Sequence, residues 1–419
     1  MRPLLHFTAE TGWINDPHGL TFHDGAYHLF HQYVPGSLVW APNCHWGHAT
    51  SPDLLSWTRR GIALAPGDGD DGIWTGSLVR DGDDARILYT SVVQPDIGLG
   101  RVRLAAPTDS TWDEWTKGEV VIVPPEDLDL IAYRDPFVVR EGDLWRMFVG
   151  AGTRSGDALA LTYTSPDLTE WVYDGVAASR STYETEPVWM GALWECPQVF
   201  DVDDHWVMLS SVWDDDVLHY AGYGIGDGDS YGEGRFTPAD WGRLSHGGSY
   251  YAPSFFRDRD GRPCVMFWMR GVGDADEAWS SCLSVPYLMT AKDGRLVAAP
   301  HPELAAARGG PLAAGESAVT FDLEWSPAGP DDHLVLSNDS GAKTARVGVL
   351  DGAVSLERPG QDTWSMPWAG EELRIIVDGP VVEISSPQGL LGGAVEPTTR
   401  WHGGDPRVRA WQLSPSSSV

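Results

Sequence analysis

The chain repeats one pattern of apolar and polar positions along its first 300 residues. A short opening of polar or small residues leads into four or five mainly apolar residues, a Gly/Asp turn and a second apolar segment. The copies begin at Asp16, Thr75, Asp135, Cys196 and Ala252, so the pattern returns roughly every 60 residues, which is typical of a repeat architecture. Each copy predicts two antiparallel strands joined by a tight turn.

A second series of motifs keeps the same period. SPDLLSW ends at Trp57, TDSTWDEW at Trp115 and SPDLTEW at Trp171, and these segments fall between the strand pairs. Strand pairs can recur by chance in any all-β chain, but chance does not explain a period held over four steps. Five such units, with further strands between them, predict a five-bladed β-propeller in which each blade is a small antiparallel sheet.

The pattern changes after residue 300. A stretch rich in Ala, Gly and Pro predicts a linker over residues 301–316. Short apolar segments separated by Gly, Asp and Pro then continue to the end of the chain and predict a β-sandwich. We therefore expect an all-β protein with a propeller catalytic domain over 1–300 and a sandwich over 317–419.

Charge narrows the class of partner. The chain has 60 acidic and 29 basic side chains, a formal net charge of −31. Such a surface repels nucleic acids and anionic membranes, so neutral or cationic small molecules remain as candidate partners. No segment has the apolar length of a signal-peptide core or a membrane span, and we expect a cytoplasmic monomer or homodimer.

The four cysteines lie far apart, without a CxxC pair or a Cys/His cluster. This spacing argues against a structural zinc site and a disulfide framework. We expect buried free thiols.

Three carboxylates fall at the same phase of the repeat. Asp16 opens the first copy, Asp135 opens the third, and Glu195 directly precedes the fourth. An isolated Asp-Pro is typical of a turn, but turn chemistry does not explain two Asp-Pro pairs and one Glu-Cys-Pro in phase. Because the first strand of each blade lines the channel of a propeller, we expect the three acids to converge in one funnel.

Converging carboxylates in a chain with 21 tryptophans fit the cleavage of glycosidic bonds. One acid attacks or directs water and another protonates the leaving oxygen, while indole rings pack against the C–H faces of sugars. The sequence has no metal-binding cluster, no GxSxG motif and no phosphate-binding loop. We expect neither a cofactor nor a metal.

At these acids the sequence resembles glycoside hydrolase family 32, the invertase, levanase and inulinase family. The motifs are WINDPHG from Trp13, YRDPFV from Tyr133 and WECPQVF from Trp194. FHQYVP, WTGS and, near the C-terminus, LRIIVDGPVVEI extend the resemblance over essentially the whole chain.

The resemblance implies a retaining, double-displacement mechanism. Asp16 would be the nucleophile that forms a fructosyl ester, and Glu195 the acid that protonates the leaving oxygen and then the base that activates water. Asp135 would hold the fructose C3 and C4 hydroxyls and stabilise the transition state. Retention predicts carboxyl groups of Asp16 and Glu195 roughly 5 to 5.5 Å apart.

The neighbours of these acids in the sequence suggest their protonation states. The apolar surroundings of Glu195 should keep it protonated near neutral pH, whereas the Asn15 amide and the Arg134 charge should keep Asp16 ionised.

Positions that match the family also predict a fructose pocket. Its residues would be Asn15, Gln32, Trp40, Thr75, Ser77, Arg134, Tyr251 and Trp268.

The sequence departs from the family's pattern at Ile14, a conservative apolar change, and at His18, Ser249 and Tyr287. His18 would serve the turn or add a titrating group near the nucleophile. Ser249 and Tyr287 would lie on the rim or support the fifth blade, and so bear on the choice of leaving group.

The leading hypothesis is a β-fructofuranosidase that hydrolyses terminal β-D-fructofuranosyl residues from sucrose, fructo-oligosaccharides or fructans. One alternative is a fructosyltransferase, including one that forms difructose anhydrides, because a sugar hydroxyl can capture the same fructosyl-enzyme. Two others are a non-catalytic sugar-binding propeller and a related propeller that acts on arabinans or xylans. All three acids are present, and WINDPHG disfavours the last alternative.

Overall fold

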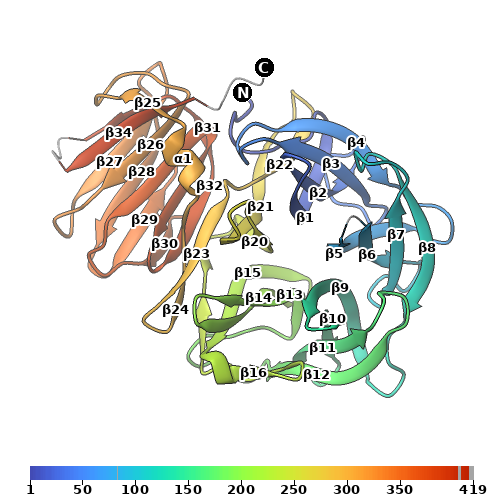
Figure 1. Cartoon of the computed structure of the whole chain (residues 1–419). Coiled ribbons are helices and arrows are strands. Elements are labelled where there is room, and N and C mark those ends of the chain that lie inside the picture. The colour runs from blue at the N-terminus through green and yellow to red at the C-terminus, as the bar shows by residue number, and fades with distance from the viewer. Residues whose placement is uncertain (83, 404–406, 415–419) are drawn as a thin grey trace.

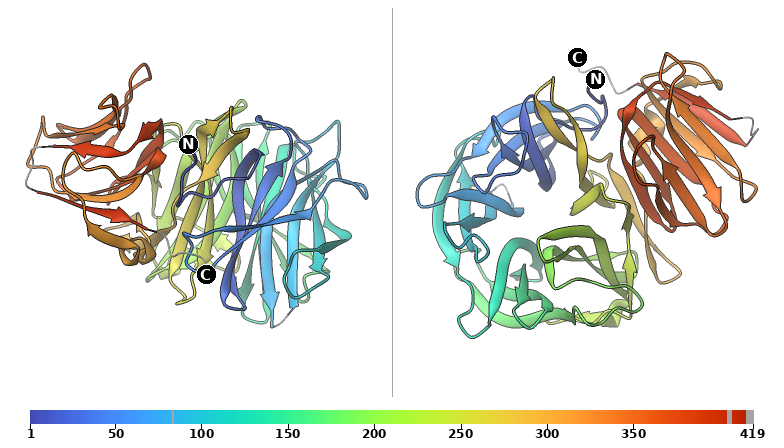
Figure 2. Two further views of the ribbon diagram at one scale, coloured as in Figure 1. Left: turned by 90° about the horizontal axis from the view of Figure 1, so that it is seen from above. Right: turned by 180° about the vertical axis from the view of Figure 1, so that it is seen from behind.

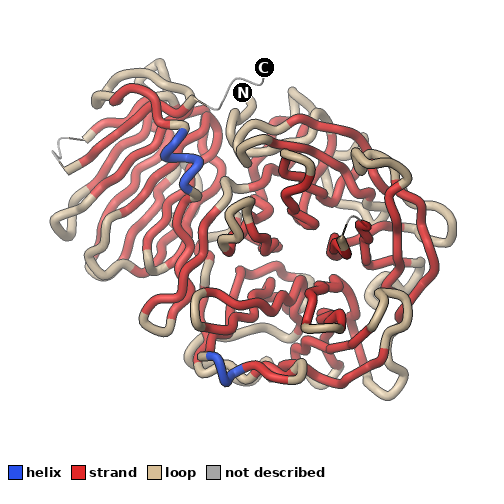
Figure 3. The backbone as a smooth tube through the Cα atoms, viewed as in Figure 1, coloured by secondary structure: helices blue, strands red, loops and turns tan. Residues whose placement is uncertain are grey.

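The structure, a computed structural model, describes residues 1–82, 84–403 and 407–414. Regular structure in these residues is almost entirely strand (Figure 3), and the helices described are the short η1 (Gly228–Ser230) and α1 (Pro302–Ala306). The all-β prediction is therefore confirmed. No helix in the described part of the chain has the length and apolarity needed to cross a membrane.

Four sheets are arranged in a ring (Figure 1). The largest is nine-stranded and joins the two ends of the ring, because β1 pairs in parallel with β22. Its strands are β1 (Gly12–His23), β2 (Ala26–Val34), β3 (His45–Ser51), β4 (Thr58–Leu64), β20 (Tyr250–Arg257), β21 (Pro263–Asp274), β22 (Trp279–Leu283), β23 (Tyr287–Lys292) and β24 (Arg295–Pro300).

The other three sheets of the ring are four-stranded. The first contains β5 (Gly72–Asp81), β6 (Asp84–Val92), β7 (Arg101–Pro107) and β8 (Trp115–Ile122). The second contains β9 (Leu130–Glu141), β10 (Leu144–Thr153), β11 (Asp157–Ser165) and β12 (Val172–Ser181). The third contains β13 (Leu193–Val202), β14 (His205–Asp214), β15 (Val217–Gly226) and β18 (Asp240–Arg243), and β16 (Tyr231–Gly232) pairs separately with β17 (Arg235–Phe236).

Each copy of the sequence repeat begins within one strand of this ring, and that strand pairs with the next in antiparallel fashion. The leading strands are β1, β5, β9, β13 and β20. They contact one another in sequence, and β20 contacts β1 again, so they form a closed inner cycle. The β1–β2 turn illustrates the local cause: Asp24 and Gly25 both have positive φ, 49° and 83°, which suits the right-handed twist of a hairpin.

The C-terminal part packs beside the ring as two sheets (Figure 2). The six-stranded sheet contains β19 (Ser245–His246), β25 (Arg308–Pro311), β26 (Thr320–Trp325), β31 (Leu373–Ser386), β32 (Gly389–Thr398) and β34 (Val408–Leu413). The five-stranded sheet contains β27 (His333–Ser337), β28 (Lys343–Leu350), β29 (Ala353–Glu357), β30 (Trp364–Pro367) and β33 (Arg400–His402).

Residues of both sheets share one apolar core that includes Phe321, Leu336 and Ile384. The segment predicted as a linker, 301–316, contains α1 and β25, and β25 pairs with β34 of the sandwich. The four cysteines are buried and free, as predicted.

A buried charge cluster joins the N-terminal segment to the sandwich. The His6 ring contacts Asp378 through Nδ1 at 2.8 Å and Glu383 through Nε2 at 2.7 Å, and the three side chains are almost wholly buried. Burial alone would lower the pKa of His6, but hydrogen bonds to Asp378 and then Glu383 outweigh it and raise the pKa to about 9. The imidazolium therefore links the ring to the sandwich at neutral pH.

Replacing His6 by glutamine should expose this link as a pH-dependent loss of stability. The pKa of His6 in the folded chain lies above the ordinary 6.5. The stability that the charged His6 ring adds is therefore complete below pH 6.5 and is lost as the pH rises through about 9. We expect wild type to exceed His6→Gln by about 3 kcal/mol in free energy of unfolding at pH 6, and by much less above pH 9. Urea unfolding across this range measures the difference, and a difference independent of pH would contradict the charged link.

Candidate active site

Every leading strand carries a β-bulge at the point where the repeat begins. At each bulge, the leading strand has one residue more than its partner strand between two consecutive pairs of facing residues. Examples lie between Ile14 and Pro17 and between Glu195 and Gln198. The same irregularity occurs in β5, β9 and β20. Bulges re-aim side chains and tolerate proline, which lacks an N–H for the ladder. This explains the Asp-Pro and Glu-Cys-Pro signals and turns the acids toward the common axis.

The three acids line one pocket of about 680 Å³ at the centre of the ring. This volume is within the range of about 300 to 1,000 Å³ for small-molecule sites. Asp16 comes from β1, Asp135 from β9 and Glu195 from β13. The wall is rich in indole rings and is completed by two arginines, and its lining residues are Trp13, Asn15, Asp16, Gln32, Trp40, Trp74, Ile97, Gly98, Ile131, Ala132, Arg134, Asp135, Glu195, Trp213, Asp216, Leu218, Tyr251, Trp268 and Arg270.

Three donors hold the carboxylate of Asp16. Thr75 Oγ1 donates to Oδ2 at 2.6 Å and Gln32 Nε2 donates to the same oxygen at 3.1 Å. Asn15 Nδ2 donates to Oδ1 at 3.0 Å and is itself oriented by the indole N–H of Trp13 at 3.2 Å. The orientation of Asp16 is therefore fixed from both oxygens.

Glu195 has a different set of partners. Tyr251 Oη donates to its Oε2 at 2.6 Å. Arg134 Nε lies 3.7 Å from Oε1, beyond hydrogen-bond distance. One oxygen of Glu195 is thus held by a tyrosine, and the other faces a cation across a gap.

Asp135 is held from the next sheet. The backbone N–H of Cys196 donates to its Oδ2 at 3.0 Å, and the Cys196 thiol approaches the same oxygen at 3.6 Å. Asp135 has a positive φ of 64°, a conformation that non-glycine residues adopt rarely. Its backbone N–H donates to Thr90 Oγ1 at 2.7 Å, which helps to hold that conformation.

Burial and the charges of neighbouring carboxyls raise the proton affinity of Asp16 and Asp135. Burial raises the pKa of Asp135 to about 8, with the charge of Glu195 adding to it and Arg134 opposing it. Burial also raises the pKa of Asp16, although the Thr75 hydrogen bond opposes this, and the charge of Glu195 raises it further. Both effects favour a proton on the two aspartates.

This pattern differs from the expectation for Asp16. Arg134 was expected near Asp16, but its guanidinium faces Glu195, and its carbon Cζ lies 5.6 Å from the Trp74 ring centre. The hydrogen bond from Asn15 lowers the pKa of Asp16 as expected, but burial has the larger effect. The sequence neighbours of Asp16 did not indicate that burial would outweigh the hydrogen bonds that lower its pKa.

Six of the eight predicted sugar-binding residues line the same pocket as the acids: Asn15, Gln32, Trp40, Arg134, Tyr251 and Trp268. Trp40 is at the rim with 43% of its surface exposed, whereas Trp268 is buried. Within the described residues, Trp268 Nε1 has no hydrogen-bond partner although it is buried.

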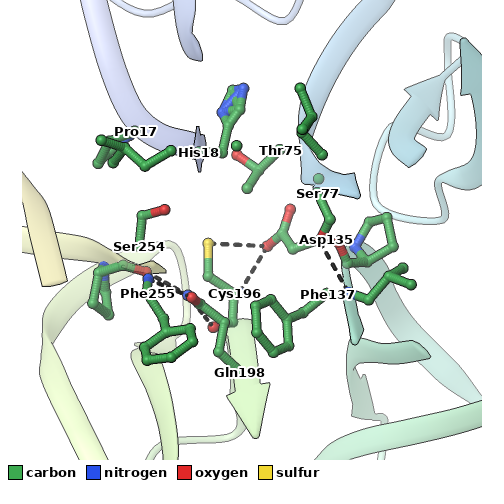
Figure 4. A pocket seen from close by; sticks show the side chains of 17 residues that line it. Pro17, His18, Thr75, Ser77, Asp135, Phe137, Cys196, Gln198, Ser254 and Phe255 are labelled. Carbon is green, nitrogen blue, oxygen red and sulfur yellow. Dashed lines mark hydrogen bonds between the residues drawn. The ribbon is translucent and has the colours of Figure 1, made fainter. Parts of the chain in front are cut away.

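Thr75 and Ser77 lie on a second, smaller cavity of about 60 Å³ that shares Asp135 with the main pocket (Figure 4). Thr75 still reaches Asp16 through its hydroxyl. Ser77 instead donates to the Pro136 carbonyl at 2.7 Å and accepts from the Val138 N–H at 3.0 Å. The hydroxyl of Ser77 therefore ties β5 to β9.

His18 also lines the smaller cavity and is buried against the Trp46 ring, with ring centres 3.7 Å apart. Burial, followed by the nearby His31, lowers the pKa of His18 well below 6.5. His18 is therefore neutral at ordinary pH, and the titrating role left open for it is not supported.

Several lining residues were not predicted. Trp213, Asp216 and Leu218 come from the β14–β15 turn region, and Arg270 comes from β21. Arg270 donates to the carbonyls of Leu218 at 2.7 Å and His219 at 3.1 Å, so it holds this wall together. None of the four belongs to a repeat opening, and no sequence signal marked them.

The chain matches the family model described as "Glycosyl hydrolases family 32 N-terminal domain" over residues 6–300. It is 33% identical over 319 residues to sucrose-6-phosphate hydrolase of Escherichia coli, covering 71% of this chain and 64% of that protein. It is also 33% identical over 374 residues to levanase of Bacillus subtilis (strain 168), covering 81% of this chain and 51% of that protein. The chain thus spans less than two thirds of the length of these relatives.

Solved structures resemble the chain over almost its whole length. A family 32 β-fructofuranosidase of Bombyx mori matches with a TM-score of 0.85 at 24% identity, covering 98% of this chain and 94% of that chain. Sucrose-6-phosphate hydrolase of Lactobacillus gasseri matches with a TM-score of 0.82 at 23% identity, covering 99% and 93%. At these identities the two matches establish a shared fold.

Proposed function

Because the chain belongs to glycoside hydrolase family 32, we propose that it is a retaining β-fructofuranosidase that releases terminal fructose from sucrose, fructo-oligosaccharides or fructans. The observation that carries the proposal is the convergence of Asp16, Asp135 and Glu195 from three strands in one pocket walled by tryptophans. A pair of carboxyls performs retaining glycoside hydrolysis, and indole rings bind the apolar faces of sugars.

In the first step, Asp16 attacks C2 of the fructosyl unit and forms an ester, while Glu195 gives its proton to the departing glycosidic oxygen. In the second, Glu195 removes a proton from water, which attacks C2 and breaks the ester. Two inversions retain the configuration. Asn15, Gln32 and Thr75 support the first role because they fix both oxygens of Asp16.

Asp135 would bind the fructosyl unit and stabilise the transition state. Its carboxyl is anchored by the Cys196 backbone N–H, which leaves acceptor capacity for the C3 and C4 hydroxyls of fructose. We propose that the same carboxyl also stabilises the oxocarbenium-like transition state. We propose Trp268 and Arg134 as further sugar contacts, because both line the pocket together with the three acids.

Incubation with sucrose, inulin and levan, followed by chromatography of the products, tests the proposed activity. We expect free fructose as the main product from at least one of them. Dominance of transfer products at low substrate concentration would instead indicate a fructosyltransferase, and no release of fructose from any of the three would refute the proposal.

Removing the Thr75 hydroxyl should move the acid limb of the pH profile. The Thr75 hydrogen bond lowers the pKa of Asp16, so Thr75→Val should raise that pKa. Asp16 must be ionised to attack, and kcat/KM reports the free enzyme. The acid limb of kcat/KM for sucrose should therefore shift to higher pH in Thr75→Val and stay in place in Thr75→Ser, which keeps the hydroxyl. An unshifted limb in the valine variant would show that Thr75 does not act on the titrating group.

We also propose that the substrates are unphosphorylated. Arg134 and Arg270 are the cations among the described lining residues, and Glu195 and backbone carbonyls already engage them. Asp216 adds a negative charge at the wall. Because like charges across an interface are costly, we expect kcat/KM for sucrose 6-phosphate to be about tenfold below that for sucrose. Equal or higher kcat/KM for the phosphorylated sugar would contradict this.

Three proposals concern organisation. The closed cycle of β1, β5, β9, β13 and β20 supports five blades, with the first and fifth sharing the nine-stranded sheet. We propose the division into 1–300, a connection over 301–316, and 317–419, as expected from composition. We propose a monomer or homodimer, which light scattering on the purified chain would distinguish.

A further inference from the structure

One segment connects the sandwich to the catalytic pocket. β19 pairs in parallel with β32 of the sandwich, with Ser245 opposite Leu390 and His246 opposite Leu391. The next two residues, Gly247 and Gly248, lie against the indole of Trp364, and a Cβ on Gly247 would be 2.6 Å from that ring. The segment then enters β20 at Tyr250. Residues 245–248 are therefore fitted to the sandwich before the chain returns to the ring.

Tyr250 is anchored to the sandwich by its hydroxyl. Its Oη donates to Glu383 Oε2 at 2.7 Å. Glu383 lies on β31, is 1% exposed, and also accepts from the Val285 N–H at 2.9 Å and from Tyr287 Oη at 2.8 Å. A Cβ on Gly392 would lie 3.0 Å from Tyr250 Oη, so the sandwich leaves little more than the space this hydroxyl needs.

The neighbouring residue on the same strand faces the pocket. Successive side chains of a strand point to opposite faces, so with Tyr250 directed at the sandwich, Tyr251 is directed at the active site. Tyr251 lines the pocket and donates to Glu195 Oε2 at 2.6 Å. Two adjacent tyrosines thus connect Glu383 to Glu195 through one short stretch of backbone.

The backbone on either side of the two tyrosines departs from a regular strand. Two glycines precede them, and the β20 bulge follows, where Ala252 has a positive φ of 45°. Without an anchor at Tyr250, the hydroxyl of Tyr251 could move relative to Glu195. A general acid must lie within hydrogen-bond reach of the atom it protonates, so such movement would directly reduce acid catalysis.

We infer that Glu383 and Tyr250 are positioning residues for Glu195, so that the sandwich sets the placement of the acid in the propeller pocket. This inference rests on the proposed function, because it assumes that Glu195 protonates the leaving oxygen. A purely structural role would instead lower stability and would affect every substrate alike.

The matched pair Tyr250→Phe and Tyr287→Phe separates the two roles. Both tyrosines are buried and donate to the same oxygen of Glu383, but only Tyr250 adjoins Tyr251. The measurement is kcat/KM for sucrose, whose leaving group needs protonation, and for a nitrophenyl β-fructofuranoside, whose leaving group needs little. Unfolding curves establish that each variant is folded at the assay temperature.

We expect Tyr250→Phe to lower kcat/KM for sucrose about tenfold, because small misplacements of catalytic groups have effects of this order. Its kcat/KM for the nitrophenyl substrate should fall less than about twofold, and Tyr287→Phe should leave the ratio of the two values unchanged. Glu383→Gln, which removes the charge of the anchor, should shift the ratio in the same direction as Tyr250→Phe.

The inference is overturned if wild type hydrolyses both fructosides and Tyr250→Phe and Glu383→Gln have the wild-type ratio, or if Tyr287→Phe shifts the ratio as much as Tyr250→Phe. A wild-type chain that hydrolyses neither fructoside would instead refute the proposed function. The two failures are therefore distinct.

Discussion

Replacing Asp16 by asparagine should lower kcat for sucrose by about 10⁴-fold or more, because loss of a nucleophile removes the covalent route and leaves only binding and electrostatics. Asparagine keeps the size of the side chain and can still accept hydrogen bonds through its amide oxygen. The pocket should therefore keep its shape, and KM should change far less than kcat.

A matched control is Asp70→Asn. Asp70 is also buried in the ring and is held by Tyr89, Arg103 and Lys117, but it does not line the pocket. Its replacement should lower the melting temperature and leave kcat within about twofold of wild type, since it touches no reacting group. Near wild-type kcat in Asp16→Asn would remove Asp16 from the mechanism.

Replacing Glu195 by glutamine should lower kcat for sucrose by about 10³-fold, within the range attributed to general acid–base catalysis. The loss in kcat/KM should be much smaller for a nitrophenyl fructoside, because its leaving group departs without a proton. Glutamine can still accept the hydrogen bond from Tyr251, so the comparison isolates the transferable proton.

Glu141→Gln provides the control for this change. Like Glu195, Glu141 accepts a hydrogen bond from a tyrosine, here Tyr231 at 2.7 Å, and it also pairs with Arg146, but it lies outside the pocket. The Glu141→Gln variant should be less stable than wild type, and its kcat/KM should change equally for the two substrates. A Glu195→Gln variant that loses equal activity toward both substrates would show that Glu195 does not protonate the leaving group.

The repeat made the strand pairs and the convergence of the acids predictable from sequence. Asp16 and Asp135 open their copies of the repeat and Glu195 directly precedes its copy, on the leading strands β1, β9 and β13, and all three reach one pocket. The bulges strengthen this relation, since each inserts one residue at the point where the motif begins. A prediction based only on the alternation of residues in a strand would not have included them.

Other parts of the site depend on contacts between distant segments. Arg270 is held at the pocket by hydrogen bonds to the backbone carbonyls of Leu218 and His219. No local sequence pattern predicts these bonds between distant segments. Ser77 was predicted with the sugar-binding residues because its WTGS motif matches the family, but its hydroxyl bonds to β9. The link from Glu383 to Tyr250 joins residues that are 133 positions apart.

The tryptophans show the same division. Trp115 is buried in the ring core, whereas Trp40 at the rim and Trp268 in the wall both line the pocket. Period in the sequence identified the first kind. The second kind was predicted from the resemblance to the family, and the fold brings Trp40 and Trp268 to one cavity.

Trapping of the covalent intermediate tests the catalytic role of Asp16 most directly. The Glu195→Gln variant, incubated with a nitrophenyl β-fructofuranoside, should form the ester and hydrolyse it slowly, because the base for the second step is missing. Mass spectrometry of the digested protein should find one fructosyl unit on the peptide that contains Asp16, and none in a variant that also carries Asp16→Asn. A fructosyl unit on another residue, or rapid turnover with release of inverted fructose, would contradict the proposed mechanism.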